Sequence, residues 1–203
     1  MAEEFNLYQD IAGRTGGSIY IGCVGPVRTG KSTFIKNFME LMILPGIQDP
    51  NERNRTIDEL PQSSNGKTIM TTEPKFIPNE GVEVLFTDQN GEPVRFKAKM
   101  IDCVGYMVPG AIGHIEEEIP FVQAAEIGTR KVIAEHSTVG LVITTDGTVT
   151  DIPREDYQEA ERRVIEELKA LGKPFIVLLN SANPERETVK LLAGQLAEEY
   201  GVQ

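Results

Sequence analysis

The sequence predicts an α/β domain in which a mostly parallel sheet carries helices on both faces and includes one antiparallel hairpin strand. Short apolar segments alternate with longer amphipathic segments, which is the order of strand–helix–strand units. Several short segments are apolar throughout, as strands buried on both faces are. The Asn90–Gly91 pair lies between two β-branched segments and is typical of a tight turn joining antiparallel strands.

Five strands and four helices are predicted along the chain. The strands are residues 17–25, 82–88, 94–102, 138–146 and 174–182, and the helices are residues 32–44, 119–136, 151–172 and 183–201. The first helix has apolar residues at helical spacing, which are Phe34, Ile35, Phe38, Leu41 and Met42. Pro45–Gly46 ends this helix, and Gly172 ends the third. Asp151 and Asn183 are candidate N-caps of the last two helices.

The chain length favours a single domain. With 203 residues it can bury one sizeable core, which we place at residues 16–203. Residues 44–74 are too long and too polar for a simple connection, so we expect a functional loop there. The sequence stops after a helix, where another strand would be expected. We therefore interpret it as a domain excised from a longer protein.

Composition excludes several classes of function. The formal net charge is −11 and the isoelectric point about 4.7, which argues against nucleic-acid binding and gives no support to binding of anionic lipid. No stretch of 18 apolar residues is present, so we expect no membrane span, and the acidic N-terminus does not resemble a signal peptide. Two cysteines, Cys23 and Cys103, lie in apolar strands and are expected to be reduced core residues. We expect a cytoplasmic protein.

The strongest motif is "GPVRTGKS", residues 25–32, which fits the phosphate-loop pattern G-x-x-x-x-G-K-[ST]. Glycines let backbone N–H groups point at one anion, a lysine reaches the β- and γ-phosphates, and a hydroxyl holds Mg²⁺. The predicted strand before the motif and helix after it provide the required context. The expected nucleotide-binding residues of this loop are Gly25, Pro26, Val27, Arg28, Thr29, Gly30, Lys31, Ser32 and Thr33.

A second motif follows the third predicted strand. Asp102-Cys103-Val104-Gly105 fits D-x-x-G, in which the aspartate holds Mg²⁺ through water and the glycine N–H contacts the γ-phosphate. Ser32 and Asp102 are therefore candidate metal ligands. In Ras-like proteins the next residue is the glutamine that orients the attacking water. Here it is Tyr106, so hydrolysis must use another polar group.

Thr71 and Thr72 in the long loop are candidates for that group. A threonine in a switch-I-like loop can ligate Mg²⁺ when the γ-phosphate is present, or position water. The alternative is that both are β-branched residues entering a strand before Pro74. Arg28 has two interpretations as well: a guanidinium that neutralises charge in the transition state, or a solvated surface charge.

The base-recognition segment departs from the GTPase pattern. GTPases carry N-K-x-D after the corresponding strand, and its aspartate accepts two hydrogen bonds from guanine. Here residues 180–183 are Asn180-Ser181-Ala182-Asn183, so the carboxylate is replaced by an amide. A site built for guanine would reject adenine, because buried polar groups would stay unpaired. We therefore predict that ATP is preferred to GTP, with Asn180 and Ser181 contacting the nucleotide.

Several long blocks, including "GPVRTGKSTFIKNFMELMILP", "GKTIMTTEPKFIPN", "IDCVGYMVPGA" and "VIEELKALGKPFIVLLNS", resemble the stage IV sporulation protein A family. These are spore-coat morphogenetic ATPases of endospore-forming bacteria. The resemblance covers nearly the whole chain. It implies a P-loop NTPase fold like that of the translation-factor class of GTPases, with ATP as substrate. The family's phosphate-loop lysine, paired threonines and D-x-x-G aspartate fall on Lys31, Thr71, Thr72 and Asp102.

The resemblance also implies a biological role. Hydrolysis would drive irreversible self-assembly into a shell on the mother-cell side of the forespore. The partners it implies are other spore-coat proteins and a small forespore-membrane anchor protein. Two departures are present: the segment near residues 110–120 is short, and family members continue well beyond residue 203. The segment near residues 110–120 is either naturally short in this protein or has been altered in this sequence.

Two other functions fit the same motifs. One is a regulatory GTP switch whose loops recruit an effector. The other is a nucleotide-dependent scaffold that binds without turnover. Nucleotide preference separates the first from an ATPase, and a phosphate-release assay separates the second.

Overall fold

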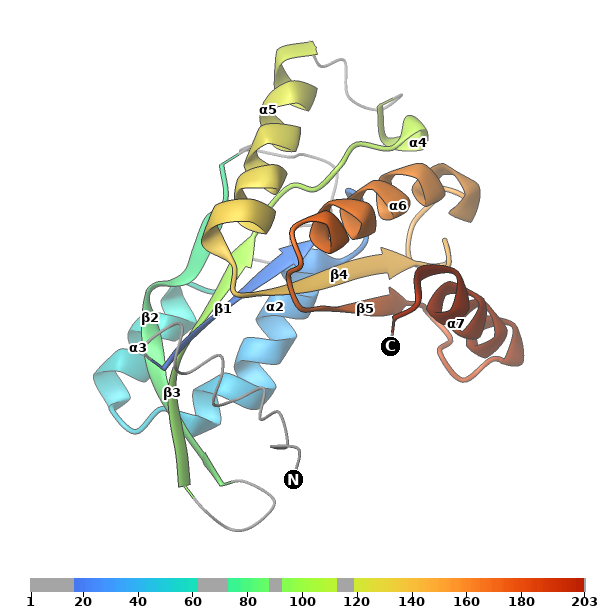
Figure 1. Ribbon diagram of the computed structural model, residues 1–203. Helices are drawn as coiled ribbons and strands as arrows, with labels where there is room; N and C mark the ends of the chain where they lie inside the picture. Colours follow the sequence, from blue (N-terminus) through green and yellow to red (C-terminus); the bar gives the residue numbers. More distant parts are fainter. Residues whose placement is uncertain (1–16, 62–72, 88–92, 113–118, 203) are drawn as a thin grey trace, which may run out of the picture.

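The computed structural model describes residues 17–61, 73–87, 93–112 and 119–202. Its centre is a five-stranded sheet in the order β2-β3-β1-β4-β5 (Figure 1). The strands are β1 (Ser18–Val24), β2 (Lys75–Thr87), β3 (Pro93–Asp102), β4 (Val139–Thr145) and β5 (Phe175–Asn180). Four of them run parallel, and β2 pairs antiparallel with β3. The predicted fold class, including its single antiparallel hairpin, is confirmed.

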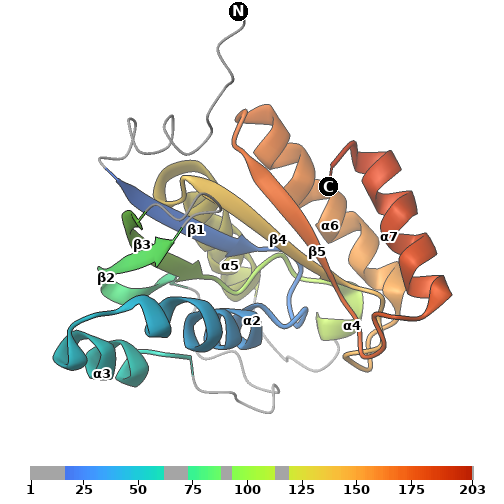
Figure 2. The ribbon, with the colours of Figure 1, turned by 90° about the horizontal axis from the view of Figure 1, so that it is seen from below.

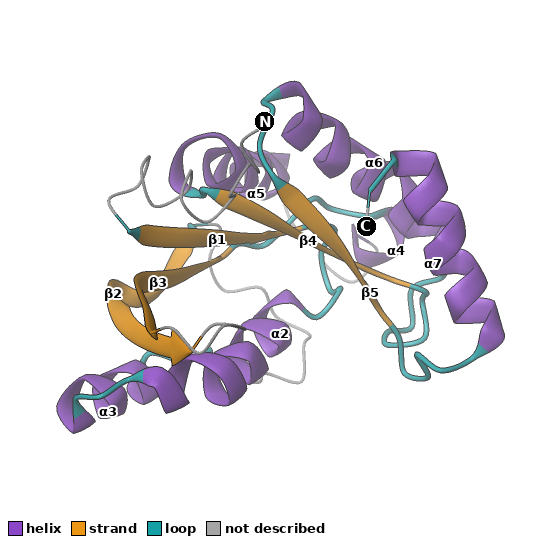
Figure 3. Cartoon of the chain, turned by 60° about the horizontal axis from the view of Figure 1, so that its bottom comes forward, coloured by secondary structure: helices purple, strands orange, loops and turns teal. Residues whose placement is uncertain are grey.

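Helices cover both faces of the sheet (Figures 2 and 3). On one face lie α2 (Lys31–Phe38), a π-helical turn (Met39–Ile43), a 3-10 turn (Leu44–Gly46) and α3 (Pro50–Asp58). The other face carries α5 (Ile119–Lys131) with a π-helical turn (Val132–His136), α6 (Arg154–Ala170) and α7 (Glu187–Tyr200). The short helix α4 (Pro109–Ile112) lies between β3 and α5 in the chain. Each face buries its own hydrophobic cluster against the sheet.

The first helix buries the predicted face in its first half, where Ile35 is buried and Phe34 and Phe38 pack against the core, but not in its second half. Its core residues are Ile35, Met39 and Ile43, whereas Leu41 and Met42 are 74% and 50% exposed. The cause is the π-helical turn at Met39–Ile43, in which the wider turn keeps residues four apart on one side. A regular helix with 3.6 residues per turn therefore predicts the wrong buried residues in the second half of this helix.

Both predicted N-caps are wrong. Helix α6 begins at Arg154 after Pro153, and α7 begins at Glu187 after Arg186. Asn183 instead opens a turn in which its carbonyl accepts a hydrogen bond from the Arg186 N–H at 3.1 Å. Pro184 takes the second position of that turn, where proline is favoured, so the helix starts three residues later than predicted. Pro153 similarly keeps the residue before it out of helical geometry.

The long polar segment is more regular than expected. Asp49 caps α3 by accepting a hydrogen bond from the Asn51 N–H at 2.8 Å, and Pro50 takes the first helical position. The part that carries Thr71 and Thr72 lies outside the described residues. The edge strand β5, at the other end of the sheet from β2, is less buried than predicted, since the Ile176 side chain is 50% exposed. A separate point concerns membranes. Among the described helices, none combines the length and the apolar character that crossing a bilayer requires.

Candidate functional site

The phosphate loop lies between β1 and α2, at the carboxyl end of the sheet's central strand. The backbone conformation of this loop requires glycine at positions 25 and 30. Gly25 has φ +137°, and a Cβ there would lie 2.3 Å from the Ile143 carbonyl oxygen. Gly30 has φ +91° and leads directly into α2. A side chain at either position would strain the backbone.

The loop is also tied to the segment after β3. The Val27 N–H donates to the Tyr106 carbonyl at 2.9 Å, and the Tyr106 N–H donates to the Gly25 carbonyl at 3.2 Å. These two backbone bonds join the two motifs that the sequence predicted to act together. Two main-chain hydrogen bonds therefore hold the phosphate loop against the segment after β3.

Lys31 lies inside the loop. Its side chain is 4% exposed, and its Nζ donates a hydrogen bond to the Pro26 carbonyl at 2.6 Å. Thr29 Oγ1 donates to the same carbonyl at 3.0 Å. Burial lowers the pKa of Lys31, against the opposing effect of nearby groups that include Asp102. An anion at this point would compensate a buried positive charge.

Ser32 and Asp102 meet beside Lys31. Ser32 Oγ donates to Asp102 Oδ2 at 2.6 Å, although the two residues are 70 positions apart in the sequence. The other oxygen, Oδ1, is buried and has no hydrogen-bond partner among the described residues. Burial raises the pKa of Asp102, while the Ser32 bond and the Lys31 charge act against it.

This pair fits Mg²⁺. A hydroxyl and a carboxylate are hard oxygen donors, and the free Oδ1 leaves ligand capacity unused. Within the described residues there is no group of three or more His, Cys, Asp or Glu side chains that could hold a metal. Mg²⁺ typically takes only one or two protein carboxylates and completes its shell with phosphate and water. Thr71 and Thr72, the pair from which a further metal ligand is expected at Thr72 or its neighbour, lie outside the described residues.

Gly105 faces the phosphate loop. With φ +98°, a Cβ at this position would lie 2.6 Å from Lys31 Nζ and 2.2 Å from the Gly25 carbonyl oxygen. Only glycine fits so close an approach. The D-x-x-G glycine therefore lies beside the lysine, as the motif predicts.

Tyr106 points away from the phosphate loop. It is 1% exposed, its hydroxyl donates to Glu167 on α6, and the Arg163 guanidinium lies 4.2 Å from its ring centre. Arg163 in turn makes two 3.0 Å hydrogen bonds with Glu126 on α5. Burial and the Glu167 contact raise the pKa of Tyr106. The prediction that it does not replace the water-orienting glutamine agrees with this orientation.

Arg28 has an uncommon backbone conformation. Its φ is +61°, the left-handed region that side chains other than glycine rarely adopt. Its Nε is buried and has no hydrogen-bond partner within the part of the chain that the structure describes. Burial raises the pKa of Tyr157 on α6, and the Thr150 hydrogen bond and the Arg28 charge oppose this effect. Strain of this kind is found at ligand sites.

Asn180 and Ser181 lie at the carboxyl end of β5, as predicted. Asn180 Nδ2 donates to the Thr29 carbonyl at 3.0 Å and would lie 2.6 Å from a Cβ on Gly30. The asparagine thus holds the phosphate loop from the β5 side. Ser181 Oγ donates to Asp146 Oδ2 at 2.6 Å. Asn183 is exposed, and the structure shows no base-reading role for it.

Sequence reasoning missed Asp146 and Thr148. They follow β4, and Asp146 accepts hydrogen bonds from the Thr148 N–H at 2.9 Å and hydroxyl at 2.6 Å. A signal was present: Asp146-Gly147 comes directly after a buried parallel strand. Ligands in open parallel sheets bind outside the carboxyl ends of the strands, so this loop was a candidate by position.

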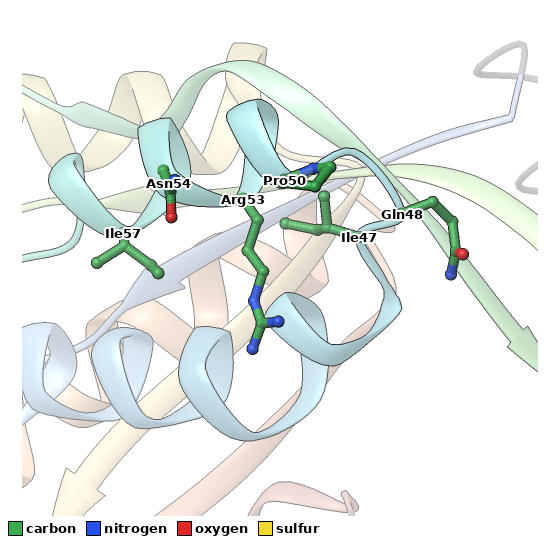
Figure 4. A pocket seen from close by; sticks show the side chains of 6 residues that line it. All are labelled: Ile47, Gln48, Pro50, Arg53, Asn54 and Ile57. Atoms are coloured by element: carbon green, nitrogen blue, oxygen red, sulfur yellow. The ribbon is translucent and has the colours of Figure 1, made fainter.

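One hollow on the surface is remote from these motifs. Ile47, Gln48, Pro50, Arg53, Asn54 and Ile57 line it, from α3 and the turn before it (Figure 4). None of these residues belongs to the phosphate loop, the D-x-x-G segment or the loops after β4 and β5. The hollow is not part of the candidate nucleotide site.

Known proteins match this chain over nearly its full length. The family described as "Stage IV sporulation protein A, ATPase domain" matches residues 2–203. The chain is 53% identical to Stage IV sporulation protein A of Bacillus anthracis, 55% to that of Bacillus subtilis (strain 168) and 52% to that of Clostridioides difficile (strain 630). The alignments cover 98%, 98% and 97% of this chain, respectively, but 42% of each relative.

Proposed function

Because the chain belongs to the family of stage IV sporulation protein A ATPase domains, we propose that it binds ATP with Mg²⁺ and hydrolyses it to ADP and phosphate. The observation that carries this proposal is the convergence of Lys31, Ser32, Asp102 and Gly105. A buried ammonium, a hydroxyl–carboxylate pair and a closely approaching glycine meet at one end of the phosphate loop. This is the donor set that a β,γ-phosphate group and its metal require.

Each residue has a defined task in this proposal. Lys31 exchanges its contact with the Pro26 carbonyl for phosphate oxygens and neutralises charge that develops on the γ-phosphate. Ser32 and Asp102 are the residues that would hold Mg²⁺, which would supply positive charge to neutralise the phosphates. The Gly105 N–H donates to the γ-phosphate. The backbone bonds from Tyr106 to the loop keep these groups in place without reorganisation.

The attacking water is oriented by a group other than Tyr106, whose hydroxyl is committed to Glu167. We assign this task to the segment with Thr71 and Thr72, and the alternative, a structural role at the start of β2, is tested by the same experiment. Arg28 is the candidate for charge neutralisation in the transition state, because its Nε has no partner among the described residues.

The energy of hydrolysis serves assembly in this proposal. The chain spans 42% of the length of its curated relatives, so assembly is a property to be tested on the full-length protein. We propose that turnover locks full-length copies into a polymer at the cytoplasmic, mother-cell side of the forespore. Other spore-coat proteins and a small membrane-anchored protein would be its partners there.

A phosphate-release assay with ATP and GTP, with and without Mg²⁺, tests the proposal. We expect Mg²⁺-dependent release from ATP, little release from GTP, and loss of release in the Thr71→Ala, Thr72→Ala double variant with ATP binding retained. Preferred turnover of GTP would favour the regulatory switch. Binding of ATP without release would favour the scaffold.

A further inference from the structure

The structure indicates in which direction a bound nucleotide would extend from the phosphate loop. The phosphate loop follows the central strand β1, β3 lies on one side of it, and β4 and then β5 lie on the other. The metal pair Ser32–Asp102 and the γ-phosphate glycine Gly105 are all on the β3 side. The rest of a nucleotide must therefore extend toward the β4–β5 side. Asn180 after β5 already contacts the Thr29 carbonyl of the phosphate loop from that side.

Three polar side chains form one cluster on that side. Asp146 follows β4 and accepts hydrogen bonds from the hydroxyl groups of Ser181 and Thr148, both at 2.6 Å. Thr148 Oγ1 also accepts from the Ala182 N–H at 2.9 Å, so several hydrogen bonds join the loops after β4 and β5. We refer to Asp146, Thr148 and Ser181 as the acceptor cluster. It is partly open to solvent rather than buried in the core.

The cluster presents acceptors and withholds donors. Both hydroxyl protons are committed to the Asp146 carboxylate. Asp146 Oδ1 receives two hydrogen bonds from Thr148, whereas Oδ2 receives one from Ser181. Since each carboxylate oxygen has two acceptor positions, Oδ2 has one left. Burial raises the pKa of Asp146, but these hydrogen bonds together lower it, so the carboxylate stays charged near neutral pH.

We propose that the acceptor cluster determines base specificity, with Asp146 Oδ2 accepting a hydrogen bond from the 6-amino group of adenine. Adenine carries a donor at this position, and guanine carries an acceptor oxygen. A carboxylate facing the 6-position attracts the first and repels the second. The proposal rests on the proposed function as an ATPase, and it adds residues to the base site that the N-K-x-D pattern does not contain.

The role of Ser181 explains the loss of the GTPase lysine. A lysine at position 181 would place a cation against Asp146 and occupy the carboxylate. Serine uses a single short hydrogen bond and leaves Oδ2 with a free acceptor position. The replacement of lysine by serine thus makes the carboxylate available to the base.

The test is competition against a ribose-labelled fluorescent ATP analogue in the intact protein. The competitors are ATP, purine riboside triphosphate, which lacks the 6-amino group, inosine triphosphate, which has a 6-oxygen, and inorganic tripolyphosphate. We expect purine riboside triphosphate to bind about tenfold more weakly than ATP, as for one hydrogen bond to a charged group. Inosine triphosphate should bind more weakly still.

Asp146→Ala is the decisive variant, and Asp151→Ala, an exposed aspartate in the same connection, is its control. We expect Asp146→Ala to weaken the binding of ATP about tenfold. The variant should then bind ATP and purine riboside triphosphate with equal affinity. Tripolyphosphate should be unaffected, which also shows that the variant is folded. Asp151→Ala should change none of these affinities.

Two results would overturn the inference. One is equal binding of ATP and purine riboside triphosphate by the parent protein. The other is an equal loss of ATP and tripolyphosphate binding in Asp146→Ala, which would indicate that the carboxylate only shapes the loop. Failure of the proposed function is distinguishable, because it appears in the phosphate-release assay as binding of ATP without release, or as preferred turnover of GTP, whereas the base inference is decided by the competition experiment alone. A parent protein that binds neither ATP nor tripolyphosphate would overturn both.

Discussion

The two ends of the proposed nucleotide site, a phosphate end around Lys31 and a base end around Asp146, are built in different ways. At the phosphate end, backbone geometry and buried groups decide the shape: Gly25, Gly30 and Gly105 have positive φ, and Lys31 is almost fully buried. At the base end, partly exposed side chains from two loops meet through hydrogen bonds around Asp146. The phosphate end is therefore specific for a chemical group shared by all nucleoside triphosphates. In our proposal, single side chains at the base end decide which base is preferred.

The supports beneath the two ends differ as well. Under the phosphate end, Tyr106 connects the loop to α6 through its backbone on one side and its hydroxyl on the other. Beneath the base end, Glu161 of α6 is fully buried and receives two 2.7 Å hydrogen bonds from Arg154. The hydroxyls of Thr144 and Tyr200 donate to the same carboxylate. The loop with Asp146 thus runs between Thr144 and Arg154, both of which are hydrogen-bonded to Glu161.

The largest expected effect is at the phosphate end. Lys31→Ala should lower ATP turnover by roughly 10³-fold or more, because it removes the fixed cation beside the β,γ-phosphates. A Lys31→Arg variant keeps the charge but is too large for the buried position, so it should recover little activity. Phosphate release and displacement by tripolyphosphate would be measured together. Normal tripolyphosphate binding in Lys31→Ala would contradict the assignment.

Glu161→Ala tests the support beneath the base end. It leaves the Arg154 guanidinium, whose side chain is 13% exposed, without its partner. Loss of one member of a buried ion pair costs about 3–5 kcal/mol, so the free energy of unfolding in urea should fall by about that amount. Glu159→Ala, an exposed glutamate of the same helix, is the control and should change it by less than about 0.5 kcal/mol. Similar losses in both variants would show that the ion pair does not stabilise the fold.

Tyr106→Phe separates anchoring from catalysis. The ring and its contact with Arg163 remain, while the hydroxyl's hydrogen bond to Glu167 and its interaction with Arg130 are lost. We expect the free energy of unfolding to decrease by about 1.5–3 kcal/mol, with turnover at saturating ATP changed less than threefold. A large loss of turnover with unchanged stability would instead place the hydroxyl in the reaction.

Arg28 tests backbone strain at the phosphate end. Because its φ is +61°, Arg28→Gly should be about 1 kcal/mol more stable than Arg28→Ala in thermal or urea unfolding. The two variants lack the same guanidinium, so they should share the same reduced turnover if Arg28 neutralises charge in the transition state. Unchanged turnover in both would assign Arg28 to the surface-charge alternative.

The smallest expected effect is a pH dependence at the base end. The pKa of Asp146 is lower in the folded protein than its ordinary value, since hydrogen bonds outweigh the effect of burial. A lowered carboxylate pKa stabilises the fold at pH values above the unfolded pKa of about 4, and this contribution is lost as pH falls through the folded pKa. The stability difference between the parent protein and Asp146→Asn should therefore be full at pH 6 and shrink below about pH 4. A difference that grows on acidification would contradict this sign.

The fold class was accessible from the sequence because it depends on patterns that are local. Alternating apolar and amphipathic segments identified all five strands, although β2 begins at Lys75, seven residues before its predicted start. Asn90–Gly91 indicated the hairpin, and the turn itself lies outside the described residues. Helix starts and faces were less accessible. The π-helical turn at Met39–Ile43 and the turn opened by Asn183 follow from how the chain packs and bends, and the residue types there also fit regular helices.

The phosphate end was determined by the sequence itself, because one loop of eight residues and one tetrapeptide supply its chemistry. Their glycines, lysine, hydroxyl and carboxylate have few other uses in that order. The base end was decided by the tertiary structure. Asp146 and Ser181 are separated by 35 positions, and only the parallel pairing of β4 with β5 brings the ends of the two strands together. A hydrogen bond between such residues leaves no periodic or short-range pattern in the sequence, since neither residue type is required by its neighbours in the chain.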